Sequence, residues 1–410
     1  MRKSADVVIR MQQGSENIKL LFPDRIDWDV WRSQRSDVPY SEDVISFLDE
    51  LSNALLHDKN ARSYPDVMTF AFFCRRANIM KCKEQTAIKE LRLGRGVLFH
   101  IAPSNVPINF AFSLVAGLLA GNRNVVRVSS KEFPQVDLIV NHLKSFSETN
   151  RWPSVLQRIA LVQYERDDQA TSFFSSFCQV RIIWGGDATI NQIRKSQIQA
   201  RSFDVTFADR YSIAAFNANE MSDESLSSLA SSFYNDTYLF DQNACSAPHL
   251  VVWLGSAKNI ETVRPIFWKT LHDIVKEKYN FQPVMSVDKL AAFYRQAVSM
   301  PMKRVETEDN LLVRVRLDNL SESIEDYKCT GGYFSEYIAD NLDEVAKIVN
   351  NKYQTLAYYG FKKEDLEEFV SRNQLLGIDR IVPIGATTDF SFVWDGYDLI
   401  RTLSRVITIK

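Results

Sequence analysis

The sequence has little excess charge, no long apolar run and no leader-like N-terminus. The net charge is -2 over 410 residues, and because binding to a phosphate backbone needs clustered cations, a nucleic-acid binder is not expected. No apolar run reaches the roughly 18 residues that span a bilayer, and the N-terminus lacks the apolar stretch of a secretory signal. We therefore expect a cytoplasmic protein without a membrane span.

Disulfide and metal signatures are also missing. The five cysteines contain no C-x-x-C pair, so we expect free thiols in a reducing compartment rather than a disulfide framework or a zinc site. The five histidines include no i, i+4 pair, so no metal site is predicted. Internal repeats and low-complexity tracts are absent from the sequence as well.

The composition and the pattern of apolar residues point to a folded α/β protein. With 45% hydrophobic and 24% charged residues, the chain is neither disordered nor fibrous, and its length favours two domains. From Arg95 onward, strand patterns alternate with helix patterns, which is typical of a parallel sheet with helices on its faces. The expected helices lie at 41–57, 66–78, 108–120, 134–146, 169–177, 222–234, 261–278 and 288–299, and the strands at 96–102, 124–128, 158–163, 180–184, 211–216, 249–254 and 311–315.

Two strand ends in the first α/β unit are candidate ligand sites, because such sheets bind ligands where strands end and helices begin. One is the run from Arg127 to Lys131. In the other, Gly185 and Gly186 follow a strand directly and Asp187 is the expected helix N-cap. Exposed backbone N–H groups there can approach a dinucleotide closely. A turn without a ligand explains the two glycines equally well.

Asn105 lies between Pro103 and Pro107, which fix a bend after a strand. A side-chain amide held there can donate to a developing oxyanion, and a preorganised donor of this kind contributes roughly 3 kcal/mol. On local grounds alone, a helix-capping role for Asn105 is favoured.

Cys245 is the candidate nucleophile. It lies on a polar turn before Pro248, whereas Cys74 and Cys178 lie in apolar surroundings typical of core residues. A helix N-terminus or a cofactor ring beside Cys245 would raise its thiolate fraction, and an inert buried thiol is the alternative. His249 opens the next strand, so we expect a structural role for it rather than a Cys-His dyad.

Taken together, these segments resemble the acyl-CoA reductase family, whose best-known member is the fatty acid reductase of bacterial luminescence, a branch of the aldehyde dehydrogenase superfamily. The resemblance covers about 92–410. It rests on His-Ile-Ala-Pro-Ser-Asn-Val-Pro at 100–107, Leu-Ala-Gly-Asn-Arg-Asn-Val-Val-Arg-Val at 119–128, Asp-Gln-Asn-Ala-Cys-Ser-Ala-Pro at 241–248, Asp-Arg-Ile-Val-Pro-Ile-Gly at 379–385 and Trp-Asp-Gly-Tyr-Asp-Leu-Ile at 394–400.

The resemblance implies an aldehyde dehydrogenase-like α/β fold. Residues 1–90 would form a mostly helical segment packed on a Rossmann-type cofactor domain at 91–208. A catalytic α/β domain at 209–385 would carry the nucleophilic cysteine, and 386–410 would return along the chain and end in an oligomerisation strand. The alternation of apolar residues at 404–410 fits such a strand, which often pairs with the edge of another subunit.

The resemblance also assigns roles to individual residues. Cys245 becomes the nucleophile, and Asn105 and the Cys245 backbone N–H become the oxyanion donors. The cofactor would be held by Arg127, Ser129, Ser130, Lys131, Gly185 and Gly186. Arg127 replaces the lysine usual in the superfamily, and the cluster around it can pair with a 2′-phosphate, so NADPH is favoured over NADH.

Two departures from the superfamily refine the predicted reaction. The Glu-Leu-Gly-Gly element of aldehyde oxidisers is replaced by Val205-Thr-Phe-Ala-Asp-Arg210. Without that glutamate, water attack on an acyl-enzyme should be slower by about 10²–10⁴-fold. The Glu-x-Phe-Gly-Pro element is also missing, with Thr330-Gly-Gly-Tyr333 near its place.

We therefore expect NADPH-dependent reduction of an acyl-CoA or acyl-carrier thioester to an aldehyde through an acyl-cysteine. The alternatives are an NAD(P)-dependent aldehyde dehydrogenase and an acyl-transfer subunit without hydride chemistry. The resemblance implies as partners an acyl-protein synthetase or an acyl carrier protein, and it implies a homo-oligomer.

Overall fold

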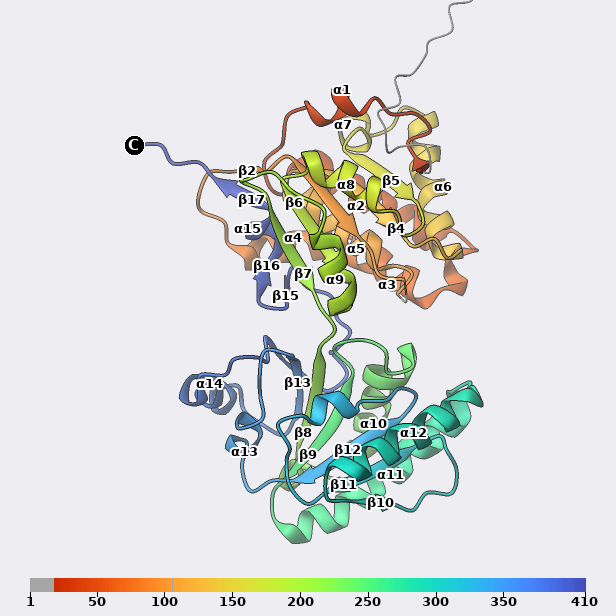
Figure 1. Cartoon of the computed structure of the whole chain (residues 1–410), viewed down its shortest axis with the longest axis vertical. Coiled ribbons are helices and arrows are strands. Elements are labelled where there is room, and N and C mark those ends of the chain that lie inside the picture. Colours follow the sequence, from red (N-terminus) through yellow and green to blue (C-terminus); the bar gives the residue numbers. More distant parts are fainter. Residues whose placement is uncertain (1–17, 105) are drawn as a thin grey trace, which may run out of the picture. The chain divides into compact units, whose positions relative to one another are not determined.

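The structure, a computed structural model, describes residues 18–104 and 106–410. These residues form two units, each with its own sheet (Figure 1). The first unit contains the described residues up to Ala208 together with 391–393 and 397–410. The second contains 209–390 and 394–396. Within the described residues, no helix is both long and apolar enough to cross a membrane.

The first unit is built on a six-stranded sheet in the order β1-β5-β4-β3-β6-β7. All neighbouring strands are parallel except β1, which is antiparallel to β5. The expected parallel sheet is therefore present, with one antiparallel edge strand added by the N-terminal segment. The strands are β1 Lys19–Phe22, β3 Val97–Ile101, β4 Arg123–Val128, β5 Ile159–Gln163, β6 Val180–Trp184 and β7 Phe203–Phe207.

The helices predicted around this sheet are present with one exception, and the short helices at 28–32, 153–156 and 399–402 were not predicted. The helix predicted at 66–78 is two helices, because Arg75 has an extended backbone and Asp49 of α2 accepts a hydrogen bond from the Arg76 N–H at 2.8 Å. A side chain distant in sequence therefore starts a new helix. The helices are α1 Trp28–Arg32, α2 Glu42–His57, α3 Pro65–Phe73, α4 Arg76–Thr86, α5 Asn109–Leu119, α6 Pro134–Glu148, α7 Pro153–Leu156, α8 Asp168–Phe177, α9 Asp187–Arg194 and α15 Leu399–Thr402.

The stop between α5 and β4 is explained by Gly121. Its φ of +87° lies in the region that favours glycine. A Cβ there would also lie 2.2 Å from the carbonyl oxygen of Asp37. This glycine therefore ends α5 where the sequence predicts and lets the chain enter β4.

The second unit is built on a seven-stranded sheet in the order β10-β11-β12-β9-β8-β13-β14. Only β10 is antiparallel to its neighbour. The strands are β8 Tyr211–Asn217, β9 Pro248–Leu254, β10 Met302–Val305, β11 Val313–Leu317, β12 Tyr333–Ile338, β13 Tyr353–Tyr359 and β14 Arg380–Pro383. The helices are α10 Asp223–Thr237, α11 Ala257–Lys278, α12 Val284–Ser299, α13 Asp343–Ala346 and α14 Lys363–Asn373.

Helices cover both faces of the second sheet and bury its strands. On one face, Trp268 of α11 packs against both Trp253 of β9 and Phe233 of α10. On the other, Val345 and Phe369 belong to the cluster around β8, β9 and β13. Burial on both sides explains why these strands read as nearly continuous apolar runs.

The C-terminal strand is present but pairs within the chain. β17 (Ser404–Val406) is antiparallel to β2 (Arg92–Gly94), and the Arg92 guanidinium donates to the Ser404 hydroxyl at 2.8 Å. One edge of β17 is thus occupied by its own chain, so pairing with another subunit would have to use the other edge. A second short ribbon joins β15 (Val393–Trp394) and β16 (Tyr397–Asp398).

Candidate functional site

The carboxyl ends of β3, β4 and β6 form one edge of the first sheet. β3 lies between β4 and β6 in the sheet. After β3 the chain adds β4 and β5 on one side, and it then crosses to the other side of β3 to add β6. The strand order thus reverses beside β3, and open α/β sheets bind ligands at such a point. Both predicted cofactor segments lie at this edge: 127–131 spans the end of β4, and 185–186 follows β6.

Gly185 and Gly186 leave backbone exposed at the start of α9. Gly186 is the N-cap of α9 and Asp187 is its first residue, so the expectation that Asp187 is the cap was wrong. No side-chain cap bond is made at this end of the helix within the described residues. A Cβ at Gly186 would meet no described atom within 4 Å, whereas one at Gly185 would lie 3.3 Å from Thr189. Gly186 therefore borders space that a ligand can enter, beside N–H groups suited to an anion.

The turn after β4 holds the predicted ribose cluster in a specific arrangement. Ser129 is buried, and its hydroxyl accepts from the Lys131 N–H at 3.1 Å. The Arg127 guanidinium donates to the Tyr164 carbonyl at 3.1 Å and lies 4.7 Å from the Tyr164 ring centre. The structure thus brings the serines and Lys131 together but directs Arg127 toward β5.

An acidic neighbour was missed by the sequence analysis of this turn. The Ser130 hydroxyl donates to Glu165 at 3.3 Å. Glu165 follows β5, so it is brought beside Ser130 only by the pairing of β4 with β5. A carboxylate at this position favours ribose hydroxyls, whereas Lys131 favours a phosphate. Asn105, the predicted oxyanion donor, lies outside the described residues.

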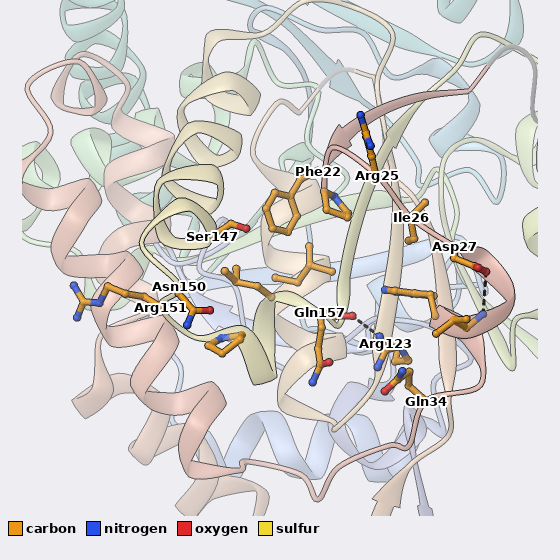
Figure 2. A pocket seen from close by; sticks show the side chains of 16 residues that line it. Phe22, Arg25, Ile26, Asp27, Gln34, Arg123, Ser147, Asn150, Arg151 and Gln157 are labelled. Carbon is orange, nitrogen blue, oxygen red and sulfur yellow. Dashed lines mark hydrogen bonds between the residues drawn. The ribbon is translucent and has the colours of Figure 1, made fainter. Parts of the chain in front are cut away.

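The first unit also contains a cavity of about 380 Å³, and Figure 2 shows the side chains that line it. Arg123 and Ile159, at the starts of β4 and β5, line it together with Trp31. The Arg123 guanidinium donates to the Gln157 carbonyl and lies 4.7 Å from the Trp31 ring centre. None of the predicted site residues lines this cavity, and it lies at the amino ends of the strands, so we do not assign it to the site.

In the second unit, Cys245 lies on a turn that hydrogen bonds from Ser212 and Gln242 hold in place. The Ser212 hydroxyl donates to the Cys245 carbonyl at 2.7 Å. Gln242 is 1% exposed, and its amide donates to the carbonyls of Pro248 (2.9 Å) and Tyr333 (3.1 Å). The same amide accepts from the N–H groups of Gly332 (2.9 Å) and Tyr333 (3.1 Å). Segment 330–333 therefore packs directly against the Cys245 turn.

Four residues set the electrostatics of the Cys245 thiol. Burial raises the pKa of Cys245 above its ordinary value of 9.0. The backbone N–H of Arg210 hydrogen-bonds the sulfur and lowers the pKa, the negative charges of Asp209 and Asp395 raise it, and the Lys328 ammonium lowers it. Lys328 donates to Asp209 at 2.6 Å and to the Arg210 carbonyl at 3.1 Å. The lysine thus holds the backbone segment that supplies the N–H.

Asp395 is a second carboxyl group that the sequence analysis did not assign. Burial raises its pKa to about 6, although the positive charge of Arg210 opposes the shift. Its carboxylate accepts from the Gln354 amide at 2.5 Å and lies 3.7 Å from the Arg210 guanidinium. Asp395 lies in the Trp-Asp-Gly-Tyr segment that carries the family resemblance, which was the available signal. The stretch 205–210 contains no glutamate, but the carboxyl groups of Asp209 and Asp395 still act on the Cys245 thiol.

His249 has a structural environment, in line with the sequence analysis. Its ring stacks on Tyr211 at 5.7 Å, and it hydrogen-bonds the backbone of Cys329. Burial lowers its pKa to about 3, and the Lys328 charge acts in the same direction. Cys74 and Cys178 are fully buried, as expected, and the described structure contains no disulfide.

These two units and their strand edges define a protein with the aldehyde dehydrogenase-like fold. Lactaldehyde dehydrogenase from Escherichia coli aligns with a TM-score of 0.63 at 12% identity, over 93% of this chain and 88% of that one. 1-Pyrroline-5-carboxylate dehydrogenase from Thermus, solved with bound NAD, aligns with a TM-score of 0.62 at 12% identity, over 92% and 82% of the two chains.

The chain belongs to the acyl-CoA reductase (LuxC) family, whose model matches residues 75–408. It is similar to the long-chain acyl-protein thioester reductase of Photorhabdus luminescens, with 22% identity over 80% of this chain. A reductase of the same name from Photorhabdus laumondii is 21% identical over 80% of the chain. The match spans 65% of the length of each of these two relatives, slightly less than two thirds.

Proposed function

We propose that this protein reduces an acyl thioester to an aldehyde through an acyl group bound covalently to Cys245. The observation that carries the proposal is the position of Cys245. Its sulfur accepts an N–H from Arg210, on a turn that Gln242 holds by a bond to the Pro248 carbonyl and Ser212 by a bond to the Cys245 carbonyl. A thiol held at a fixed position on a turn supports a role in acyl transfer.

In the proposed reaction, the Cys245 thiolate attacks the carbonyl carbon of the thioester. A new C–S bond forms, the bond to the carrier sulfur breaks, and the carrier leaves as a thiol after taking up the proton that Cys245 lost. The Arg210 N–H and the Lys328 ammonium stabilise the thiolate before attack. Asn105 and the Cys245 backbone N–H are proposed as donors to the oxyanion, which is the role the family resemblance assigns them.

A nicotinamide dinucleotide fits the edge of the first sheet, and when bound it supplies the hydride that reduces the acyl group. Gly186 offers open space, and the uncapped start of α9 offers N–H groups for the pyrophosphate. Ser129, Ser130 and Lys131 are proposed to hold the adenosine ribose, with Lys131 pairing a 2′-phosphate, so NADPH is the proposed cofactor. After reduction, cleavage of the C–S bond releases the aldehyde and returns Cys245 to its starting state.

The proposed substrate is a long-chain thioester on coenzyme A or on a carrier protein. It is supported by the family description and by the names of the Photorhabdus relatives. An acyl-protein synthetase or acyl carrier protein is the proposed source of the acyl group.

Covalent capture tests the proposal directly. After incubation with a long-chain acyl-CoA and no reductant, intact-mass spectrometry should show one added acyl group. NADPH should then remove that group. Cys245→Ala should abolish the adduct, whereas Cys329→Ala, which alters another half-buried cysteine of the same unit, should retain it. Comparable turnover of acyl-CoA by Cys245→Ala would refute the mechanism, and rapid formation of free acid from aldehyde and NADP⁺ without coenzyme A would indicate an oxidiser.

A further inference from the structure

The outward face of α12 carries apolar side chains along its whole length. The helix packs inward through Met285, Lys289, Ala292 and Gln296. On the outside, Val284, Val287, Leu290, Tyr294 and Val298 are 59%, 67%, 45%, 60% and 90% exposed. Single exposed apolar side chains are common, but a continuous stripe on one helix marks an interaction surface. Figure 1 shows α12 as a long helix of the second unit.

The exposed residues repeat with the spacing of a coiled-coil seam. Val284, Val287, Ala291, Tyr294 and Val298 follow one another at intervals of three, four, three and four residues, and all are exposed. These are the a and d positions of a heptad. Leu290 and Ala297 then fall at g positions, beside the seam. Asp288 and Arg295 fall at e positions and are the charged residues of α12 whose side chains are exposed.

We propose that this face pairs with the same helix of a second copy of the chain, in antiparallel orientation. Antiparallel pairing places Ala291 opposite Tyr294 of the partner subunit, so a small side chain leaves room for a ring. It likewise places Val287 opposite Val298 of the partner subunit. Because a two-fold axis repeats each contact, one face satisfies both copies.

The charges select the second copy and the antiparallel direction. In an antiparallel pair, e positions face e positions, so Asp288 lies beside Arg295 of the partner subunit and the contact occurs twice. Parallel pairing would instead place Asp288 beside Pro283 and Arg295 beside Leu290. Arg295 donates to the Asp326 carbonyl at 3.5 Å, near the outer limit for a hydrogen bond. Its remaining N–H groups can therefore serve a partner.

The size of the seam sets the expected strength. A helix of 16 residues is roughly 24 Å long, and one helix pair of that length lies at the low end of specific interfaces. We therefore expect a reversible contact whose occupancy depends on protein concentration. It is independent of β17, which lies in the first unit.

Mass measurement by sedimentation velocity tests the pairing. Ala291→Glu places a carboxylate in the seam at an exposed helical position, so folding should be preserved while the dissociation constant rises at least roughly tenfold. Ile266→Glu is the matched control, since Ile266 is an isolated exposed apolar residue on α11, 41% exposed. It should leave the association unchanged. A wild-type chain that is monomeric at high micromolar concentration would overturn the proposal, and so would an Ala291→Glu chain that associates normally.

A charge exchange tests the orientation. Asp288→Arg and Arg295→Asp should each weaken association, because each places like charges together twice. The double variant should restore it. If the double variant is as weak as either single variant, or if the single variants associate normally, the antiparallel pairing is wrong and another partner covers the face.

Discussion

The two sheets present their candidate functional residues at opposite edges. In the first unit, Gly185, Gly186 and Ser129 follow the carboxyl ends of parallel strands. In the second, Arg210 and Cys245 precede β8 and β9, so they lie at the amino edge of the parallel strands. The first edge is made of small residues and exposed backbone, and the second carries a thiol and several charges.

In the proposed function, this difference separates the residues that bind the cofactor from those that carry out the chemistry. The carboxyl edge of a parallel sheet offers helix N-termini, which suit a dinucleotide. The amino edge offers turns instead, and a turn fixed by side chains can hold a nucleophile. Only Ala208, Asp209 and Arg210 separate the carboxyl end of β7, in the first sheet, from the amino end of β8, in the second. Variants at each edge should therefore affect one function and spare the other.

The largest expected effect is at Gln242. Gln242→Leu removes four hydrogen bonds that hold the Cys245 turn, and because small displacements of a nucleophile are costly, acylation by acyl-CoA should slow by about 10²-fold. Gln296→Leu is the matched control. Gln296 is also buried, and it bonds Ser335 and the Tyr333 hydroxyl, so stability should fall while the acylation rate stays nearly unchanged. Equal slowing in both variants would make Gln242 merely structural.

The buried histidines of the two units predict a shared pH dependence. Burial lowers the pKa of His100 to about 4 and that of His249 to about 3, whereas an unfolded histidine titrates near 6.5. Below pH 6.5 the unfolded chain therefore binds more protons, and the free energy of unfolding falls by about 2 kcal/mol per histidine between pH 6.5 and 5. Urea unfolding of the wild type and of a histidine variant at the two pH values isolates this loss, because the Asp395 carboxyl, whose pKa burial raises to about 6, titrates in the same range with the opposite sign.

His249→Phe separates the contributions of the two units. The phenyl ring can keep the stacking on Tyr211 but cannot take up a proton, so about half of the histidine contribution should disappear. His100 should supply the remainder, since its two ring nitrogens bond Ser113 and Asn124. An unchanged pH dependence in His249→Phe would show that His249 is not neutral in the folded protein.

A tenfold effect is expected at the first edge. Gly186→Val adds a side chain where no described atom lies within 4 Å, so the fold should tolerate it while dinucleotide affinity falls by about tenfold or more. Calorimetric titration with NADPH measures the change, and the alkylation rate of Cys245 serves as the internal control. Unaltered NADPH affinity would remove Gly186 from the proposed cofactor site.

The smallest effects should come from the charges around Cys245, and they should have opposite signs. Lys328→Met removes a cation that lowers the pKa of the thiol, and Asp395→Asn removes an anion that raises it. At pH 8, alkylation by iodoacetamide should slow in the first variant and accelerate in the second, each roughly threefold to fivefold. Rate profiles measured against pH should shift in the same directions, with the wild-type rate still rising above pH 9.0 because burial raises the pKa.

Sequence patterns located most elements, because burial on one helix face or along a strand is visible in residue spacing. β6 has the predicted bounds, α2 differs from prediction by one residue at its start, and α5 differs by one residue at each end. The break between α3 and α4 was not predictable, since it depends on Asp49 reaching Arg76 across space. Strand order was equally hidden, and with it the meeting of Ser130 and Glu165.

The sequence by itself determined the α/β pattern, the candidate thiol at Cys245 and the glycines after β6, because chain stiffness, side-chain size and local spacing are properties of neighbouring residues. Only the tertiary structure decided that the two sheets present their candidate residues at opposite edges and that Gln242 holds the Cys245 turn. It alone placed Arg210, Lys328 and Asp395 around that thiol. These contacts join residues far apart in the chain, and electrostatic and hydrogen-bond energies depend on distance in space, which folding sets.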